Sequence, residues 1–241
     1  MASFVLIPGA MHGRWTWDRV VPLLEAAGHA AVAPDLPGMG TNTAIPVEQV
    51  TLADWGDFVA GLVRQAHDRA GAPVVLVGHS RGGLVIGEAA ERVPELLAGL
   101  AYVTALLVPP GQSLADVTGH RPDPAAAPLD GAQLAALARA QFYSGCTPED
   151  ADWAIANLHR EPMQIMTTPA TVTWERWGRV PRAFVECSDD RTLTLDKQRE
   201  MQAAAPCDPV LTLAADHSPF LCAPQALADA LLAIAARFAP R

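Results

Sequence analysis

The sequence has few positively charged residues, and they form no cluster. One lysine, Lys197, accompanies sixteen arginines against 26 acidic residues, so the formal net charge is -9. Proteins that bind nucleic acids or anionic membrane surfaces present a basic patch, which is missing here. We therefore expect no nucleic-acid partner and no membrane partner. The preference for arginine and alanine over lysine is typical of GC-rich bacterial genomes, which hints at a bacterial source.

Cysteine is scarce, and long apolar runs are missing. The four cysteines form no CxxC pair and no Cys/His grouping at zinc-ligand spacing, so we expect free thiols in a reducing compartment and no metal site. No window approaches the roughly 18 uninterrupted apolar residues of a membrane span. The opening "MASFVLIPGA" has no basic segment before its apolar run, which predicts a first strand rather than a signal peptide. The expected location is cytoplasmic.

What the chain does have is a regular alternation of short β-type runs and longer helical patterns. With 241 residues, half of them hydrophobic, it can bury one substantial core as a single globular unit. Strands that alternate with helices indicate a mostly parallel sheet covered on both faces, an α/β fold. The predicted strands are "FVLI" (4–7), "AAVA" (30–33), "PVVLV" (73–77), "LAYVTAL" (100–106), "RAFVE" (182–186) and "PVLTLA" (209–214).

Helix boundaries are marked by ordinary capping residues. "WTWDRVVPLLEAAG" is predicted as a helix that ends at Gly28. The next helix has Thr51 as its N-cap, Asp54 three residues later in a capping box, and Gly71 at its end.

The alternation stops between residues 109 and 180. This stretch contains helical patterns, among them "GAQLAALARAQFYSG" and "PEDADWAIANLHR", and no convincing strand. We interpret it as a helical cap inserted between two strands of a core formed by residues 1–108 and 181–241. Open α/β sheets bind ligands at the carboxyl edge of the strands, and the cap should lie there.

The stretch "VVLVGHSRGGLVIGEAA" places Ser80 between a strand and a helix. The pattern Gly-x-Ser-x-Gly alone is weak, but a strand before it and a helix after it are what a nucleophile elbow requires. The tight turn needs glycines on either side, and the helix amino end favours developing negative charge. His79, next to the serine, is expected to point away from it and to pack.

A nucleophilic serine needs a base and an acid that orients the base. His217 follows the last predicted strand in "VLTLAADHSPFL", and Asp189 and Asp190 follow the strand before it in "RAFVECSDDRTL". The order serine, aspartate, histidine is that of an α/β-hydrolase. From position alone, either aspartate could serve.

Four segments together resemble the α/β-hydrolase superfamily: "FVLIPGAMHGRWTWDRVVPLLEAAGHAAVAPDLPGMG", "VVLVGHSRGGLVI", "VECSDDRTL" and "ADHSPFLCAPQALADAL". More closely, they are similar to the branch that holds plant methylesterases, hydroxynitrile lyases and their bacterial esterase relatives. The resemblance covers the core and the position of the cap, whereas the cap sequence itself is only loosely similar.

The resemblance implies a serine esterase with a catalytic triad and no cofactor. It selects Asp190, the carboxylate before Arg191, as the acid, with Asp189 as the fallback. It implies an oxyanion hole made by the backbone N–H groups of Ala10 and Arg81. Pro8 stands where the family usually has histidine. Because the expected donor at Ala10 is a backbone N–H, we expect this change to affect the local support of the loop more than the reaction. Trp15 and Trp17 match a family pattern and are expected to pack behind this loop.

Within this branch, two positions separate esterases from hydroxynitrile lyases. The lyases carry a threonine in the oxyanion loop and a lysine directly after the catalytic histidine, where this chain has Gly9 and Ser218. Without that cation, cyanohydrin cleavage loses its electrostatic support, and ester hydrolysis remains. Hydroxynitrile-lyase-like activity, hydrolysis of a lactone, a thioester or a C-C bond, and a ligand-binding receptor or carrier with slow turnover stay open as alternatives.

The cap is rich in aromatic and methionine residues, some of which should form an apolar pocket over the sheet edge. That favours a small apolar or aromatic ester as the substrate. The candidate pocket residues are Leu107, Phe142, Tyr143, Trp153, Met163, Met166 and Phe220. The Arg81 side chain is expected to be exposed or bound along its helix, with pairing to a substrate carboxylate as the alternative. The sequence leaves a homodimer open.

Overall fold

The computed structural model describes residues 1–121 and 129–239. Its centre is one six-stranded sheet in which every pair of neighbours is parallel. The strand order β2-β1-β3-β4-β5-β6 places β3 between β1 and β4. All six predicted strands are present, and the α/β fold is confirmed. The strands are β1 (Ser3–Ile7), β2 (Ala30–Val32), β3 (Val74–His79), β4 (Leu97–Val103), β5 (Arg182–Cys187) and β6 (Val210–Leu213).

The fourth strand ends three residues earlier than the sequence predicts. The apolar run continues to residue 106, but Thr104 has a φ of 35°. A non-glycine residue in that region cannot continue an extended strand, so the chain turns at Thr104. This turn is the first sign that the residue has a special role.

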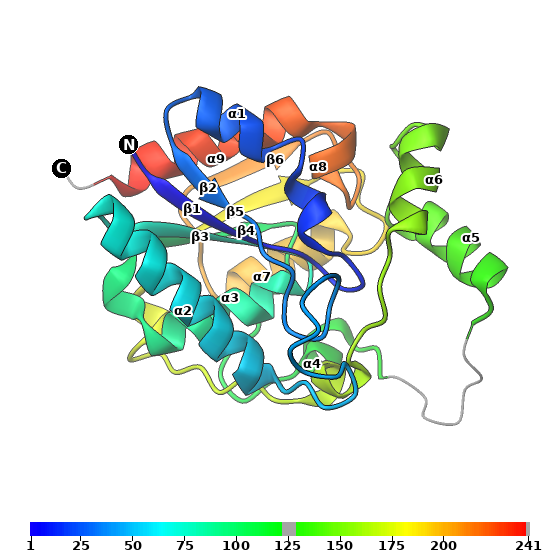
Figure 1. Cartoon of the computed structure of the whole chain (residues 1–241), viewed down its shortest axis with the longest axis horizontal. Coiled ribbons are helices and arrows are strands. Elements are labelled where there is room, and N and C mark those ends of the chain that lie inside the picture. Colours follow the sequence, from blue (N-terminus) through cyan, green and yellow to red (C-terminus); the bar gives the residue numbers. More distant parts are fainter. Residues whose placement is uncertain (122–128, 240–241) are drawn as a thin grey trace.

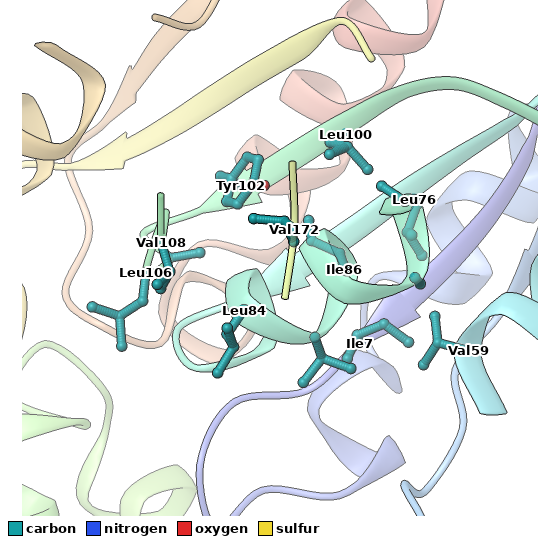
Figure 2. Packing of buried hydrophobic residues seen from close by; sticks show 14 of the residues in the cluster. Ile7, Val59, Leu76, Leu84, Ile86, Leu100, Tyr102, Leu106, Val108 and Val172 are labelled. Carbon is teal, nitrogen blue, oxygen red and sulfur yellow. The ribbon is translucent and has the colours of Figure 1, made fainter. Parts of the chain in front are cut away.

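Alternate residues of the strands enter two separate hydrophobic clusters, one on each face of the sheet. Val5, Val74 and Tyr102 face one cluster, whereas their neighbours Leu6 and Val75 face the other. Figure 2 shows the first cluster, with Leu76, Leu100 and Tyr102 of the strands against Leu84 and Ile86 of a helix. Burial of both faces explains why the four central strands, β1, β3, β4 and β5, are largely apolar runs, whereas the edge strands β2 and β6 are partly exposed.

Helices cover both faces of the sheet (Figure 1). Helices α1 and α9 lie on one face, and α2 and α3 lie on the other. The α-helices of the core are α1 (Val21–Ala26), α2 (Leu52–Ala70), α3 (Gly82–Arg92), α7 (Leu195–Ala204), α8 (Pro219–Cys222) and α9 (Pro224–Phe238), with 3₁₀ turns η1 (Arg14–Trp17) and η2 (Pro94–Leu96).

The predicted helix over 15–28 is divided. A 3₁₀ turn, η1, is followed by a separate helix, α1, whose first turn contains Pro22. Proline lacks the N–H that would continue the preceding turn, but it is tolerated in the first turn of a new helix.

The part of the chain between β4 and β5 that the structure describes is helical. It contains α4 (Leu114–Thr118), α5 (Gly131–Gln141), α6 (Pro148–Ala156), η3 (Met163–Thr167) and η4 (Trp177–Arg179). We call residues 109–180 the cap. Helices α5 and α6 project from one end of the sheet (Figure 1). In contrast, Leu114, Ile165 and Trp177 belong to the hydrophobic cluster of the core, so much of the cap is continuous with that core.

Among the residues described, no helix is long and apolar enough to cross a membrane.

The capping box of α2 offers a test of local stability. The Asp54 N–H donates to Thr51 Oγ1 at 3.1 Å, and the Thr51 N–H donates to Asp54 Oδ2 at 2.8 Å, as the sequence predicts. We expect Thr51→Ala to lower the free energy of unfolding by about 1 kcal/mol because the helix loses its N-cap. Thr43→Ala, at an exposed threonine outside any helix, is the control. Urea denaturation would measure both, and equal losses would contradict the expectation.

Candidate active site

Ser80 lies in a strained turn between β3 and α3. Its φ is 51°, a left-handed conformation that a non-glycine residue adopts only when its surroundings enforce it. The glycines of the motif allow this turn. A Cβ at Gly78 would lie 2.7 Å from the Gly82 carbonyl oxygen, and a Cβ at Gly82 would lie 2.8 Å from the carbonyl oxygens of Ile7 and Pro8. Glycine at position 78 therefore lets the strand approach the start of α3, and glycine at position 82 lets the elbow approach the end of β1.

The structure brings Ser80, His217 and Asp190 together in one line of hydrogen bonds. His217 Nε2 lies 2.9 Å from Ser80 Oγ, and His217 Nδ1 lies 2.7 Å from Asp190 Oδ2. Because a carboxylate only accepts, Nδ1 carries the proton and Nε2 is free to accept the serine hydroxyl. The side chains of Asp190 and His217 are buried, and Ser80 is 8% exposed.

Asp190, rather than Asp189, is the carboxylate at this place. Asp189 is exposed, whereas both oxygens of Asp190 are occupied. Oδ1 accepts the N–H groups of Thr192 at 2.7 Å and Leu193 at 2.8 Å. Oδ2, which binds His217, also accepts the hydroxyl of Thr104.

Thr104 is a residue that the sequence analysis did not identify. It is fully buried and lies just beyond β4, where its unusual φ turns the chain. A threonine that interrupts the apolar run 100–106, in the strand that follows the elbow in the chain, is the signal that could have identified it.

The loop after β1 lies directly against the elbow. A Cβ at Gly9 would lie 2.9 Å from Ser80 Cβ and 2.7 Å from His79 Nδ1, so this position has no space for a side chain. Ala10 follows in the same loop, and Arg81 stands at the amino end of α3. The two residues predicted to supply oxyanion N–H groups thus come from the two segments that meet at Ser80.

The expectation for the Arg81 side chain is wrong. It is neither exposed nor open to a substrate carboxylate, because it is 1% exposed and its charge is paired within the protein. Its Nε lies 2.9 Å from Oε1 of Glu161, a cap residue. Its Nη2 donates to the Gly9 carbonyl at 2.7 Å, and its guanidinium lies 4.2 Å from the centre of the Trp55 ring.

Glu161 links this buried charge to the oxyanion loop. Its Oε2 accepts the Met11 N–H at 2.7 Å, while Oε1 faces Arg81. Burial raises the pKa of Glu161 and lowers the pKa of Arg81, and the attraction between their opposite charges reduces both shifts without cancelling them. Both neighbours of Ala10 in the loop, Gly9 and Met11, are therefore held by this ion pair. Nothing in the local sequence around Glu161 marks this role.

A second contact joins the same loop to the cap through His12. Burial lowers the pKa of His12 to about 3, so the ring is neutral near pH 7. Its Nδ1 lies 2.6 Å from the Ala10 carbonyl, which can only accept, so Nδ1 is the protonated nitrogen. Tyr143 of the cap then donates its hydroxyl to Nε2 at 2.8 Å.

His79 is fully buried and packs against His217, which agrees with the packing role that the sequence analysis expected. Its Nε2 lies 2.7 Å from the His217 carbonyl, and the two rings are 4.9 Å apart. Burial lowers the pKa of His79 well below its usual value, so His79 is a neutral donor to the His217 backbone. Trp15 and Trp17 are also buried behind the loop, as expected.

The candidate pocket residues do not form one group: some lie near His217 and His79, and others pack into the hydrophobic cluster of the core. The Phe142 ring lies 5.6 Å from that of His217. Phe220 is fully buried, 5.0 Å from the His79 ring, and Leu107 is buried in the core cluster. Met166 packs partly buried against that cluster.

Two of the candidates are not buried near the triad. Met163 is 55% exposed, and Trp153 is 44% exposed with its ring against Trp15. Their hydrophobic character predicts a place in the pocket, but much of each side chain is exposed to solvent.

Comparisons with known proteins agree with this architecture. The model of the Alpha/beta hydrolase family matches residues 4–230. The chain is 31% identical to Methylesterase 7 of Arabidopsis thaliana over 261 residues, covering 98% of this chain and 97% of that protein. It is 30% identical to Salicylic acid-binding protein 2 of Nicotiana tabacum over 260 residues, with 98% and 97% covered.

A solved structure, a pyrethroid hydrolase from Sphingobium faniae JZ-2, superposes with a TM-score of 0.79 at 28% identity, covering 98% of this chain and 97% of that one. The predicted resemblance to the methylesterase branch is confirmed. The chain belongs to the α/β-hydrolase family.

Proposed function

We propose that the protein is a serine hydrolase that cleaves a small, apolar or aromatic carboxylic ester. The observation that carries this proposal is the line of hydrogen bonds from Ser80 Oγ through His217 to Asp190, with distances of 2.9 and 2.7 Å. Three groups of these types, in this order and at these distances, are what acyl transfer to a serine requires. The methylesterases among its relatives give independent support for an ester substrate.

In the proposed mechanism, His217 Nε2 takes the proton of Ser80 as Oγ attacks the ester carbonyl. The alcohol then leaves with the proton that His217 returns, and an acyl-enzyme remains. Water attacks that acyl group with His217 again as the base, which releases the acid and restores Ser80. Asp190 stays ionised throughout. It fixes the histidine tautomer and stabilises the imidazolium, and Thr104 supports its orientation.

The backbone N–H groups of Ala10 and Arg81 are the proposed oxyanion donors. Donors of this kind act because they are already oriented when negative charge develops. The Arg81–Glu161 pair gives a reason for that orientation, since it binds the Gly9 carbonyl on one side of Ala10 and the Met11 N–H on the other. In this proposal, Glu161 is a positioning residue of the cap.

Ester hydrolysis fits the oxyanion loop better than cyanohydrin cleavage. The lyases of this branch carry a threonine at the position of Gly9, where the structure has no space for a Cβ beside Ser80 and His79. Ser218, at the position of the lyase lysine, is fully buried and carries no charge. A departing cyanide would thus meet no cation from this residue.

The aromatic character of the surroundings supports an apolar substrate. The Phe142 ring lies beside His217, and the rings of His12, Tyr143 and Phe220 lie close behind it. Because the Arg81 charge is paired with Glu161, it offers no partner for an acidic substrate. A neutral ester therefore matches the site.

The proposal is tested first at the nucleophile. We expect Ser80→Ala to lower kcat for p-nitrophenyl acetate by about 10⁴-fold or more, because the acyl-enzyme cannot form. Ser188→Ala, at an exposed serine after β5, is the control and should keep full activity. Steady turnover by Ser80→Ala would refute the mechanism. A single burst without turnover in the wild type would instead indicate a ligand-binding protein.

The acid is tested by a matched pair of neighbouring aspartates. We expect Asp190→Asn to lower kcat by about 10³- to 10⁴-fold, because an amide at this place does not stabilise the imidazolium and favours the wrong histidine tautomer. Asp189→Asn, one residue away and exposed, should change kcat less than about twofold, as is usual for surface substitutions away from a site. Equal effects of the two changes on initial rates would contradict the assignment.

The positioning role of Glu161 predicts a rate effect without a binding effect. We expect Glu161→Gln to lower kcat by about 10- to 100-fold with little change in KM, since a displaced oxyanion donor costs transition-state stabilisation. Loss of one partner of a buried ion pair should also cost about 3–5 kcal/mol of stability.

A double variant separates positioning from stability. Arg81→Met combined with Glu161→Met removes both buried charges, which should restore much of the unfolding free energy. It cannot restore the acceptor for Met11 N–H, so kcat should stay low. Recovery of kcat together with stability in that double variant would show that Glu161 acts only on folding. Glu149→Gln, at an exposed position of the cap, is the control.

A further inference from the structure

Outside the triad, three potential metal ligands lie close together, one from the cap and two from the segment around His217. Cys146 comes from the cap loop between α5 and α6, Asp216 directly precedes His217, and Cys222 ends α8. Their ligand atoms all lie within 4.8 Å of one another. We propose that these residues form a binding site for a thiophilic divalent cation such as Zn²⁺, which would link the cap to the loop that carries His217.

The carboxylate of Asp216 is already oriented between the two thiols. The Gly145 N–H donates to Oδ2 at 2.7 Å, and the Ser218 N–H donates to Oδ1 at 2.8 Å. The Cys146 Sγ lies 3.7 Å from Oδ2, and the Cys222 Sγ lies 3.1 Å from Oδ1. Hydrogen bonds to a ligating carboxylate are the usual outer support of a metal site, and here the backbone provides them.

The distances fit tetrahedral zinc. Zn–S bonds of about 2.3 Å and Zn–O bonds of about 2.0–2.2 Å place sulfur and oxygen ligands about 3.6 Å apart. The observed separations of 3.7 Å from Cys146 Sγ and 3.1 Å from Cys222 Sγ run to different carboxylate oxygens, Oδ2 and Oδ1, so the side chains must rotate to bring both sulfur atoms around one ion. Two thiolates and one carboxylate leave a fourth position for water, as in zinc sites that stay open.

The site can be reached from solvent. A surface cavity of about 230 Å³ is bordered by Asp216 and Cys222. Arg191 and Asp189 also line this cavity. The positive charge of Arg191 would repel a cation, and the negative charge of Asp189 in the same cavity opposes that repulsion.

The binding step exchanges protons for metal–sulfur bonds. A hydrogen bond with Cys222, followed by burial, raises the pKa of the Cys146 thiol, so that thiol is protonated when no metal is bound. Each thiol that ligates Zn²⁺ releases its proton to solvent as the Zn–S bond forms, and no electron is transferred. The competing interpretation is that the thiols only satisfy the Asp216 carboxylate through S–H···O bonds.

Cadmium titration of the full-length protein in the presence of a phosphine reductant tests the site. Cd²⁺ bound to thiolates gives an ultraviolet charge-transfer band that a histidine or carboxylate site does not give. We expect one ion per chain with this band in the wild type and in the control Cys207→Ser, whose half-buried thiol lies elsewhere. Cys146→Ser and Cys222→Ser should weaken binding by about 100-fold or more, since even outer-shell changes cost 10- to 100-fold.

Thermal unfolding with Zn²⁺ gives a second readout. Zn²⁺ should raise the Tm of the wild type and of Cys207→Ser, but not that of Cys146→Ser, because a ligand stabilises only the folded state that binds it. Cys146 lies in a half-buried loop, so its serine variant should fold even if Cys222→Ser does not. The absence of the thiolate band in the wild type, or unchanged affinity in Cys146→Ser, would overturn the proposal.

Discussion

The close approach of the elbow to its neighbouring strands is the constraint on which the site depends. Because β3 lies between β1 and β4, the turn after it must fit between the ends of both. Gly82 lies against the carbonyl groups at the end of β1, and Gly83 lies against the Leu106 carbonyl beyond β4, with no space for a Cβ at either glycine. A larger residue at either place would push the elbow away. The fit fixes Ser80 relative to the β1 loop, which carries Ala10, and relative to Thr104, which supports Asp190.

The charge buried beside this elbow is the costly part of the arrangement. An arginine and a glutamate lose water when they are buried, and their attraction repays that loss only with good geometry. Arg81 and Glu161 offset part of that loss by pairing with each other and by binding the backbone of the β1 loop at Gly9 and Met11, although Arg81 Nε and Nη1 have no well-aligned hydrogen-bond partner. A buried pair of apolar residues could fill the space, but it could not bind that backbone.

The sequence predicts those parts of the molecule that depend on local pattern and order along the chain. The strand runs, the capping box at Thr51 and the positions of Ser80, of His217 and of the pair Asp189 and Asp190 after three strands follow from such patterns. The family resemblance, and not the local pattern, selects Asp190 from that pair. Thr104, Glu161 and the true surroundings of Arg81 do not follow from such patterns. Each acts through a partner from a loop far away in the chain, and Asp216 with its two cysteines does so as well. Zinc-ligand spacing could not reveal that group, because Cys146 lies 70 residues before Asp216, and Asp216 with Cys222 alone forms no zinc motif.

The long-range contacts have a common feature: each loop that carries a site residue also has a polar contact with the cap. Glu161 faces Arg81, next to Ser80, and Tyr143 binds His12, two residues after Ala10. The remaining contacts join Gly145 to Asp216, next to His217, and the Gln141 carbonyl to Thr192, two residues after Asp190. A displacement of the cap would therefore act on all four loops. Sequence differences in the cap would then affect how fast a substrate is turned over as well as how well it fits.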